Sequence, residues 1–179
     1  MTRTFVACGL PSAVRDRLTL MQGGIPRARW VDPDGLHVTL TFIGELGGGE
    51  LAAVVDALGE VEHSGFAVRL AGCGVFPTSG PPRVVWTGVE PAGELAALKR
   101  GVDRALTGVG VEFERRKYRP HVTLARLAAR THADAVGSYV VRYGAFSTAS
   151  FEIDEFALYE SVLSPRGARY YRRAVFRLG

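Results

Sequence analysis

The sequence predicts an α+β fold built from two similar halves. Three observations support this prediction: a tetrapeptide that occurs twice, a matching order of helical and strand patterns around each copy, and a composition typical of globular proteins. The chain has 179 residues, of which 47% are hydrophobic and 22% charged, and this length fits a single domain over residues 1–179. We expect two lobes whose mainly antiparallel sheets face each other across a central cleft, with helices on the outside.

The repeated tetrapeptide is His-Val-Thr-Leu, at residues 37–40 and again at residues 121–124. Each copy falls in the same order of patterns: a strand, a helix, the repeat itself as a strand, and a second helix. A Pro- and Gly-rich segment, residues 77–82, lies near the middle of the chain. Because such segments favour loops, we expect the chain to cross from one half to the other near 77–82.

Apolar residues at helical spacing predict four helices, as with Leu95, Leu98 and Val102 in the third. The helices are expected at 11–23, 49–62, 92–107 and 131–142, with Thr131 as the N-cap of the last. Segments rich in Val, Phe, Tyr and Thr predict strands at 3–9, 36–43, 65–76, 83–89, 120–127, 145–159 and 170–178. The glycine cluster at 44–49 predicts a loop. This order excludes a doubly wound parallel sheet, in which a helix follows nearly every strand.

The composition excludes several classes of protein. No apolar run approaches the ~20 residues that a membrane-spanning helix needs, and the amino-terminal segment lacks the apolar core of a signal peptide. Cys8 and Cys73 are the only cysteines, too few for a disulfide framework or a thiolate metal site. We therefore expect a cytoplasmic protein with reduced, buried cysteines. Without a recognisable interface pattern, we expect a monomer.

The charge pattern favours a partner that carries phosphate. The net charge is +4 and nearly all of the basic residues are arginines, which bind phosphate oxygens in pairs. A GC-rich genome is the alternative explanation for this arginine bias. The modest net charge favours a small phosphate ester or an RNA end over long duplex DNA. The basic residues cluster at two places: Arg115, Arg116, Lys117 and Arg119, and then Arg166, Arg169, Arg172, Arg173 and Arg177.

Each repeat carries a polar pair on one face of its strand. Side chains alternate along a strand, so His37 and Thr39 point the same way while Val38 points into the core. His121 and Thr123 form the same pair in the second copy. If a twofold axis relates the two halves, two imidazoles and two hydroxyls meet in one cleft.

This set of side chains suits phosphoryl transfer by acid–base catalysis. With an ordinary pKa near 6.5, one histidine can accept a proton while the other donates one, and the threonine hydroxyls can donate hydrogen bonds to phosphate oxygens. A zinc site is the rival interpretation, with Asp32 or Asp34 near His37. Neither histidine, however, has a ligand partner three or four residues later. Arg126 falls on the opposite strand face from Thr123 unless the strand bends there.

These residues and their surroundings resemble the two-histidine (2H) phosphoesterases, and within them the bacterial RNA 2′,3′-cyclic phosphodiesterases, once described as 2′-5′ RNA ligases. The resemblance covers nearly the whole chain. It is strongest in the extended segments around the two repeats, and the matching residues are 3–7, 29–31, 37–45, 74–76, 82–86, 118–126 and 158–161, with Gly167 and Tyr170.

The resemblance implies a specific activity. Family members open the 2′,3′-cyclic phosphate at an RNA terminus to leave a 2′-phosphate, without a metal or other cofactor. It implies that His37 is the proton donor to the departing 3′ oxygen and that His121 is the proton acceptor that activates water. It assigns Thr39, Thr123 and Arg126 to substrate binding. The two repeats are nearly symmetric, so the residues themselves do not separate donor from acceptor.

Two other functions stay open at the level of sequence. One is the reverse reaction, reversible 2′-5′ ligation of RNA ends, which the same histidines would catalyse. The other is a non-catalytic module that binds RNA ends or nucleotides in the same cleft. Basic residues near 115–119 and 166–177 are candidates for binding upstream phosphates, and Tyr118 or Trp30 for stacking on the terminal base. Packing within the fold is the alternative role for both aromatic residues.

Overall fold

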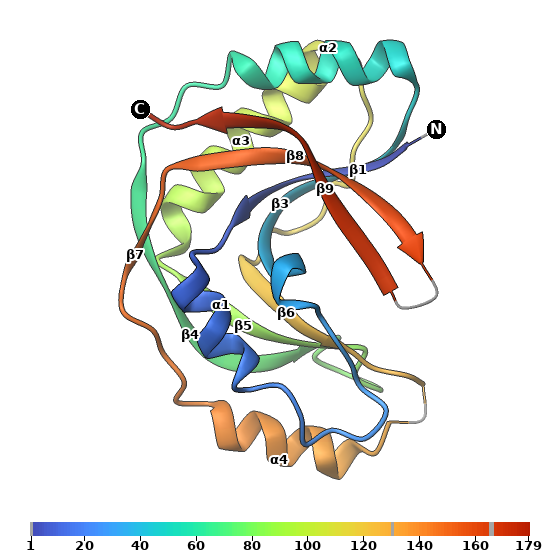
Figure 1. Ribbon diagram of the computed structural model, residues 1–179, viewed down its shortest axis with the longest axis vertical. Helices are drawn as coiled ribbons and strands as arrows, with labels where there is room; N and C mark the ends of the chain where they lie inside the picture. The colour runs from blue at the N-terminus through green and yellow to red at the C-terminus, as the bar shows by residue number, and fades with distance from the viewer. Residues whose placement is uncertain (1, 130, 165–166) are drawn as a thin grey trace.

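The computed structural model describes residues 2–129, 131–164 and 167–179. Within these ranges nine strands form one antiparallel sheet in the order β7-β4-β5-β6-β3-β1-β8-β9, with the short β2 paired to β6. Figure 1 shows that this sheet is strongly curled and that the helices lie on its outer side. The strands are β1 (Thr2–Gly9), β2 (Arg29–Trp30), β3 (His37–Leu46), β4 (Phe66–Phe76), β5 (Val84–Glu90), β6 (His121–Arg126), β7 (Phe151–Ile153), β8 (Glu155–Ser164) and β9 (Gly167–Arg177).

The four predicted helices are present in the described ranges, as α1 (Ser12–Thr19), α2 (Gly48–Gly59), α3 (Ala92–Gly108) and α4 (Ala133–Tyr143). A short 3-10 helix at Pro33–Gly35 and strand β2 were not predicted. The prediction of Thr131 as the N-cap of α4 is wrong. His132 occupies the N-cap position, because the Thr131 hydroxyl is already used in a local turn, donating to the carbonyl of Ala128 at 2.9 Å.

The fold is mixed, with helices outside an antiparallel sheet as predicted, but the expectation of two separate sheets is wrong. β3 and β6 pair through Val38 and Val122, so strands from both parts of the chain join in one sheet that curls instead of two that face each other. Helices from distant parts of the chain also pack together. α2 contacts α3, and the hydroxyl of Tyr139 in α4 donates to the carbonyl of Met21, just after α1, at 2.8 Å.

The strand predicted at 145–159 is in fact two shorter strands. β7 pairs with β4 at one edge of the sheet, whereas β8 pairs with β1 in the other part. At Asp154, between β7 and β8, the chain therefore passes from one edge of the sheet to a strand position beside β1. Residues 77–82 connect β4 to its sheet neighbour β5, and residues 60–65 lead from α2 to β4.

The main core lies between the sheet and its helices, and a smaller cluster of Phe5, Ala7, Ala157 and Tyr159 is buried apart from it. The apolar face of α3 is fully buried, at Leu95, Leu98, Val102 and Leu106, and α3 lies on β3 while α4 lies on β4. Cys8 is buried, Cys73 is half-buried, and both are free thiols. In the part of the chain that the structure describes, no helix is both long and apolar enough to cross a bilayer. The opposite face of the sheet is left for the polar residues of the two repeats.

Candidate active site

The two repeats lie side by side at the centre of the sheet. Val38 of β3 pairs with Val122 of β6 in antiparallel register, and both valines are fully buried. Residues one step away on either side therefore point to the opposite face. Each histidine stands across from the threonine of the other repeat, His37 from Thr123 and His121 from Thr39. The two histidines are thus diagonal neighbours on one face, a relationship that places Cα atoms about 7–8 Å apart.

Both imidazoles are held by the same backbone contact. Nδ1 of His37 lies 2.7 Å from the carbonyl oxygen of Gly35, and Nδ1 of His121 lies 2.7 Å from that of Arg119. A carbonyl oxygen only accepts hydrogen bonds, so Nδ1 is the donor and carries the hydrogen in the neutral ring. In His37, Nε2 lies 3.0 Å from Oγ1 of Thr39, whose hydroxyl donates to it. Each ring is therefore oriented so that Nε2 is the nitrogen that exchanges a proton.

A β-bulge at the last residue of each repeat changes the face to which the following side chains point. In β6 the register against β5 slips by one residue between Thr123 and Ala125, and Leu124 and Ala125 are both fully buried. The extra residue reverses the alternation of faces, so Arg126 points to the same face as Thr123. β3 has the same slip against β1 at the matching position of its own repeat. The sequence placed Arg126 on the opposite face from Thr123 unless the strand bends. The bulge in β6 is that bend.

Burial lowers the pKa of both histidines. For His37 the pKa falls to about 4, because burial penalises the charged ring and because His121 and Arg126 add positive charge nearby. The pKa of His121 is also lowered, first by burial and then by Arg116 and Arg126. In both rings the hydrogen bond from Nδ1 opposes this effect. Because Arg126 acts on both pKa values, its guanidinium lies within electrostatic reach of both imidazoles.

Aromatic rings pack around each imidazole and account for much of this burial. The ring centroids of Phe5 and Tyr170 lie 4.9 and 5.2 Å from that of His37, and the ring of Phe76 lies 5.0 Å from that of His121. These neighbours come from β1, β9 and β4, all distant in sequence from the histidine concerned. Their positions in the sequence did not indicate this, because only the order of strands in the sheet brings them to the histidines.

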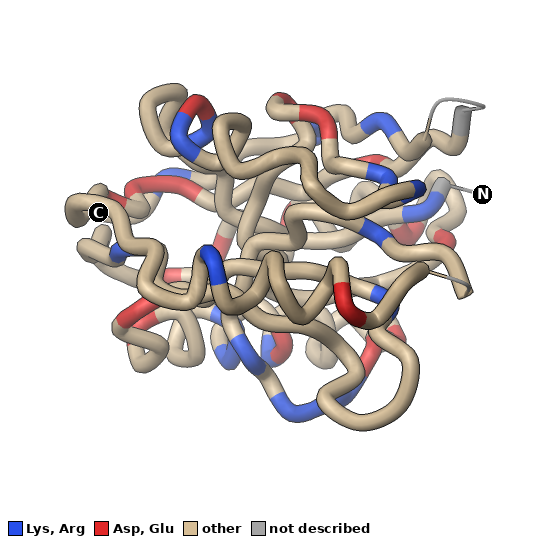
Figure 2. The backbone as a smooth tube through the Cα atoms, turned by 90° about the horizontal axis from the view of Figure 1, so that it is seen from below, with Lys and Arg blue, Asp and Glu red and all other residues tan. Residues whose placement is uncertain are grey.

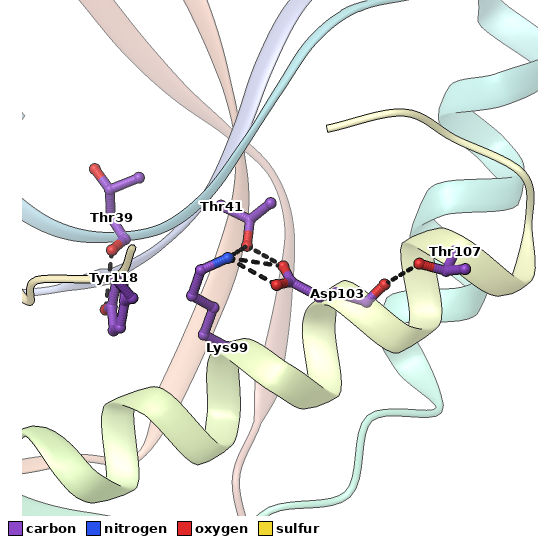
Figure 3. Close-up of polar contacts among 6 residues, drawn as sticks. All are labelled: Thr39, Thr41, Lys99, Asp103, Thr107 and Tyr118. Atoms are coloured by element: carbon purple, nitrogen blue, oxygen red, sulfur yellow. Dashed lines mark hydrogen bonds and ion pairs between the residues drawn. The ribbon is translucent and has the colours of Figure 1, made fainter. Parts of the chain in front are cut away.

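A partly buried ion pair between Lys99 and Asp103 holds the strand of the first repeat on the side of α3 (Figure 3). Nζ of Lys99 donates to both carboxylate oxygens of Asp103 at 3.0 and 2.8 Å and to Oγ1 of Thr41 at 3.2 Å. The Thr41 hydroxyl in turn donates to Asp103 at 2.7 Å. The Tyr118 hydroxyl donates to the backbone carbonyl of Thr39 at 3.1 Å. Helix α3 and the segment before β6 thus hold the strand that carries His37 and Thr39.

Other candidates from the sequence have local structural roles. Trp30 packs 5.5 Å from Tyr139 between ring centroids, and like Tyr118 it lies against the core, which agrees with the packing alternative for both aromatics. Asp32 accepts a hydrogen bond from the backbone N–H of Asp34. Among the described residues, no three or more His, Cys, Asp or Glu side chains are grouped so that they could hold a metal ion.

The two basic clusters differ in their partners. In the C-terminal cluster, Arg172 pairs with Glu155 at 2.7 Å and Arg173 with Glu160 at 3.1 Å. Arg177 pairs with Asp154 and Glu155. Arg166 lies outside the described residues. These pairs tie β9 to β8 and neutralise most of the cluster. The cluster near residue 116, by contrast, lies beside the second repeat.

Several known proteins resemble this chain in sequence. Residues 16–164 match the sequence model of the family described as the 2′-5′ RNA ligase superfamily. A protein of Archaeoglobus fulgidus named RNA 2′,3′-cyclic phosphodiesterase is 34% identical over 178 residues, covering 97% of this chain and 99% of its own length. A Thermus thermophilus protein of the same name is 35% identical over 179 residues, covering 94% of this chain and 86% of its own length.

Solved structures share the fold. Escherichia coli LigT complexed with 3′-AMP has a TM-score of 0.79 and 26% sequence identity, over 99% of this chain and 98% of that one. A crystal structure described as a phosphoesterase has a TM-score of 0.80 and 26% identity, over 99% of both chains. Sequence and fold therefore agree over nearly the full length, and this chain belongs to the 2′-5′ RNA ligase superfamily.

Proposed function

We propose that this protein hydrolyses the 2′,3′-cyclic phosphate at RNA ends to a 2′-phosphate, by metal-independent catalysis with two histidines. The observation that carries the proposal is the pairing of Val38 with Val122, because it sets two imidazoles and two hydroxyls on one face of the sheet. The relatives named RNA 2′,3′-cyclic phosphodiesterase support the choice of substrate. Only ribose has the 2′ oxygen that forms such a ring, so the substrate class is RNA or its nucleotides.

The proposed reaction is an in-line attack of water on phosphorus. Nε2 of His121 accepts a proton from the attacking water as the new P–O bond forms. The bond from phosphorus to the 3′ oxygen breaks, and Nε2 of His37 donates the proton that this oxygen needs. The products are a 2′-phosphate and a 3′-hydroxyl. The diagonal placement of the two rings on one face supports an acid and a base on opposite sides of one phosphorus atom, and the choice of donor and acceptor rests on the resemblance to the family.

Three further side chains are proposed to bind the phosphate. Thr39 and Thr123 each stand across from a histidine, where their hydroxyls can donate to the non-bridging oxygens. Arg126 adds a guanidinium on the same face, which favours the negative charge that builds on these oxygens in the transition state. The bulge at the end of the second repeat supports this role, because it turns Arg126 toward Thr123.

The substrate itself is proposed to set the protonation of the donor. In the ligand-free protein a pKa of about 4 leaves His37 neutral at pH 7, yet a proton donor has to carry its proton. A phosphate anion beside Nε2 favours the charged imidazolium and raises the pKa. We therefore expect His37 to take up a proton when the cyclic phosphate binds.

We also infer that the fold is a duplication within one domain. Outward from the junction of β3 and β6, the neighbours are β1 and β5, and each repeat strand lies between two helices in sequence. Both repeats share the bulge and the bond from Nδ1 to a carbonyl two residues earlier. A common ancestral unit accounts for these matches.

An assay with a short RNA that ends in a 2′,3′-cyclic phosphate, run in EDTA, tests the function. We expect turnover to a 2′-phosphate end. Loss of activity on chelation would replace the metal-free mechanism with a metal-dependent one. A 3′-phosphate product would show that the leaving oxygen is assigned wrongly, and tight binding without turnover would favour a non-catalytic RNA-end module.

A further inference from the structure

A basic pocket lies beside α3, separate from the two repeats. It is open, has a volume of about 860 Å³, and is lined by residues of α3 and of the segment that follows it. Of the described residues that line this pocket, one is acidic, and it is Asp103. Figure 2 shows basic and acidic residues mixed over much of the backbone. The residues that line the pocket are by contrast mostly basic, so the pocket is a local excess of positive charge. Its cations are Lys99, Arg100, Arg104, Arg115, Arg116 and Lys117.

Most of this charge is not neutralised within the protein. Lys99 pairs with Asp103 at 2.8 Å, and Arg116 pairs with Glu114 at 3.4 Å. Over residues 2–129, 131–164 and 167–179, no carboxylate lies within ion-pair distance of the other four, which are Arg100, Arg104, Arg115 and Lys117. This distinguishes the pocket from the arginines of β9, which are mostly paired with acids of β8.

Several like charges lie close together in this pocket. Arg100 and Arg104 lie one turn apart on the same face of α3, and like charges at this spacing repel each other. Arg115 to Lys117 add three consecutive cations on the facing segment. A bound polyanion offsets this repulsion, and guanidinium groups bind phosphate oxygens in pairs.

Arg116 connects the pocket to the candidate active site. Its guanidinium carbon lies 5.8 Å from the ring centroid of Phe42, and its charge helps to lower the pKa of His121. The backbone N–H of Glu114 donates to the carbonyl of Phe42 at 2.9 Å, which holds this segment against the strand of the first repeat. A chain whose terminal phosphate lies at the histidines can therefore continue past Arg116 into the pocket.

We propose that this pocket binds backbone phosphates upstream of the reacting end of single-stranded RNA. The inference rests on the proposed function, since it assigns the same site an oligonucleotide in preference to a cyclic mononucleotide. A single strand fits better than a duplex, because its terminal nucleotide has to enter the site while its backbone bends toward α3.

The test compares two substrates in a matched set of variants. The substrates are a 2′,3′-cyclic mononucleotide and a short single-stranded RNA that ends in the same group. Arg100→Glu combined with Arg104→Glu is expected to lower kcat/KM for the oligonucleotide at least about tenfold and to leave kcat/KM for the mononucleotide within about twofold. Arg142→Glu on α4, at the far end of the molecule from the C-terminal end of α3 (Figure 1), is the control for charge reversal.

Binding supplies a readout that does not depend on turnover. The fluorescence anisotropy of a labelled single-stranded RNA is measured over a range of salt, and each lost phosphate contact is expected to reduce the slope of log affinity against log salt by about 0.7. If the double substitution changes kcat/KM equally for both substrates, or leaves the salt slope unchanged, the proposed binding of RNA in this pocket is wrong. Wild-type protein that hydrolyses neither substrate but binds RNA with the expected slope would instead overturn the proposed function and leave the pocket standing.

Discussion

Arg126 points to the same face of β6 as Thr123, although it lies three positions further along the strand, which in a regular strand puts the two side chains on opposite faces. The cause is the bulge at Leu124, which adds one residue to β6 relative to β5. Regular alternation would have turned the guanidinium away from the phosphate site. The relationship places a permanent positive charge beside both imidazoles, whose pKa values it lowers.

Substitution of Arg126 is expected to reduce activity without unfolding the protein. Arg126→Ala should lower kcat/KM for a 2′,3′-cyclic nucleotide by about 10²-fold, because one donor to the transition-state charge is lost. Arg126→Lys should recover part of the loss, since it restores the charge without the paired donors. Arg142→Ala is the control. Full activity in Arg126→Ala would show that this residue does not touch the phosphate.

Loss of either imidazole that we propose to be catalytic should have a similar effect. His37→Ala and His121→Ala are each expected to lower kcat/KM by at least about 10²-fold, because each removes one partner in proton transfer. His132→Ala changes an exposed histidine at the N-cap position of α4 and should keep full activity. Steady-state kinetics on a cyclic nucleotide measures all three. If only one of the two substitutions reduces the rate, the two-histidine mechanism is wrong.

The stability of the protein should fall in acid because of His37. Its folded pKa of about 4 lies below the ordinary value of 6.5, so between pH 6.5 and 4 the unfolded chain binds a proton that the folded protein does not. The contribution is therefore full above pH 6.5 and is lost as the pH falls. At about 1.4 kcal/mol per pKa unit, the loss reaches at most about 3.5 kcal/mol.

Urea unfolding over this pH range measures the effect. His37→Asn keeps a donor toward the carbonyl of Gly35 and removes the titration, so the free energy of unfolding should depend less on pH. His132→Asn, at an exposed position, should keep the wild-type dependence. An unchanged slope in His37→Asn would mean that other groups govern acid unfolding.

Binding of substrate should be coupled to proton uptake. A 2′,3′-cyclic phosphate is a monoanion that does not titrate near neutrality, so any proton taken up from the buffer at pH 7 binds to the protein and not to the ligand. In a His121→Ala background, which prevents turnover, we expect uptake of up to one proton as the phosphate raises the pKa of His37. Calorimetry in buffers of different ionisation enthalpy measures it. The double variant with His37→Ala should show none, and equal uptake in both would assign the proton elsewhere.

The close approach of Trp86 to β4 should make one glycine irreplaceable. A Cβ on Gly74 would overlap the ring of Trp86, whose centroid lies 6.4 Å from that of His121. Gly74→Ala is therefore expected to cost about 1–3 kcal/mol of stability and to reduce activity by shifting this ring. Gly137→Ala, in α4 with open space around it, should instead raise stability by about 0.5–1 kcal/mol. Thermal unfolding compares the two, and a neutral Gly74→Ala would contradict the packing.

Much of the fold could be predicted because it depends on local patterns. The spacing of Leu95, Leu98 and Val102 correctly indicated a buried face on α3, and alternation in the repeats correctly separated His37 and Thr39 from Val38. Strand boundaries could not be predicted where one run of β-forming residues contains two strands. Residues 145–159 read as one strand because nothing local shows that the chain changes its neighbour at Asp154.

Residue periodicity specifies which face of an element is buried, but not which element covers it. For this reason the repeated tetrapeptide revealed two polar pairs, whereas their meeting on one sheet, through Val38 and Val122, came from pairing between distant strands. The bulge that turns Arg126 inward and the aromatic rings that lower the pKa values of the histidines arise in the same way. Both depend on register and neighbours, which are set when strands far apart in the chain hydrogen-bond to each other.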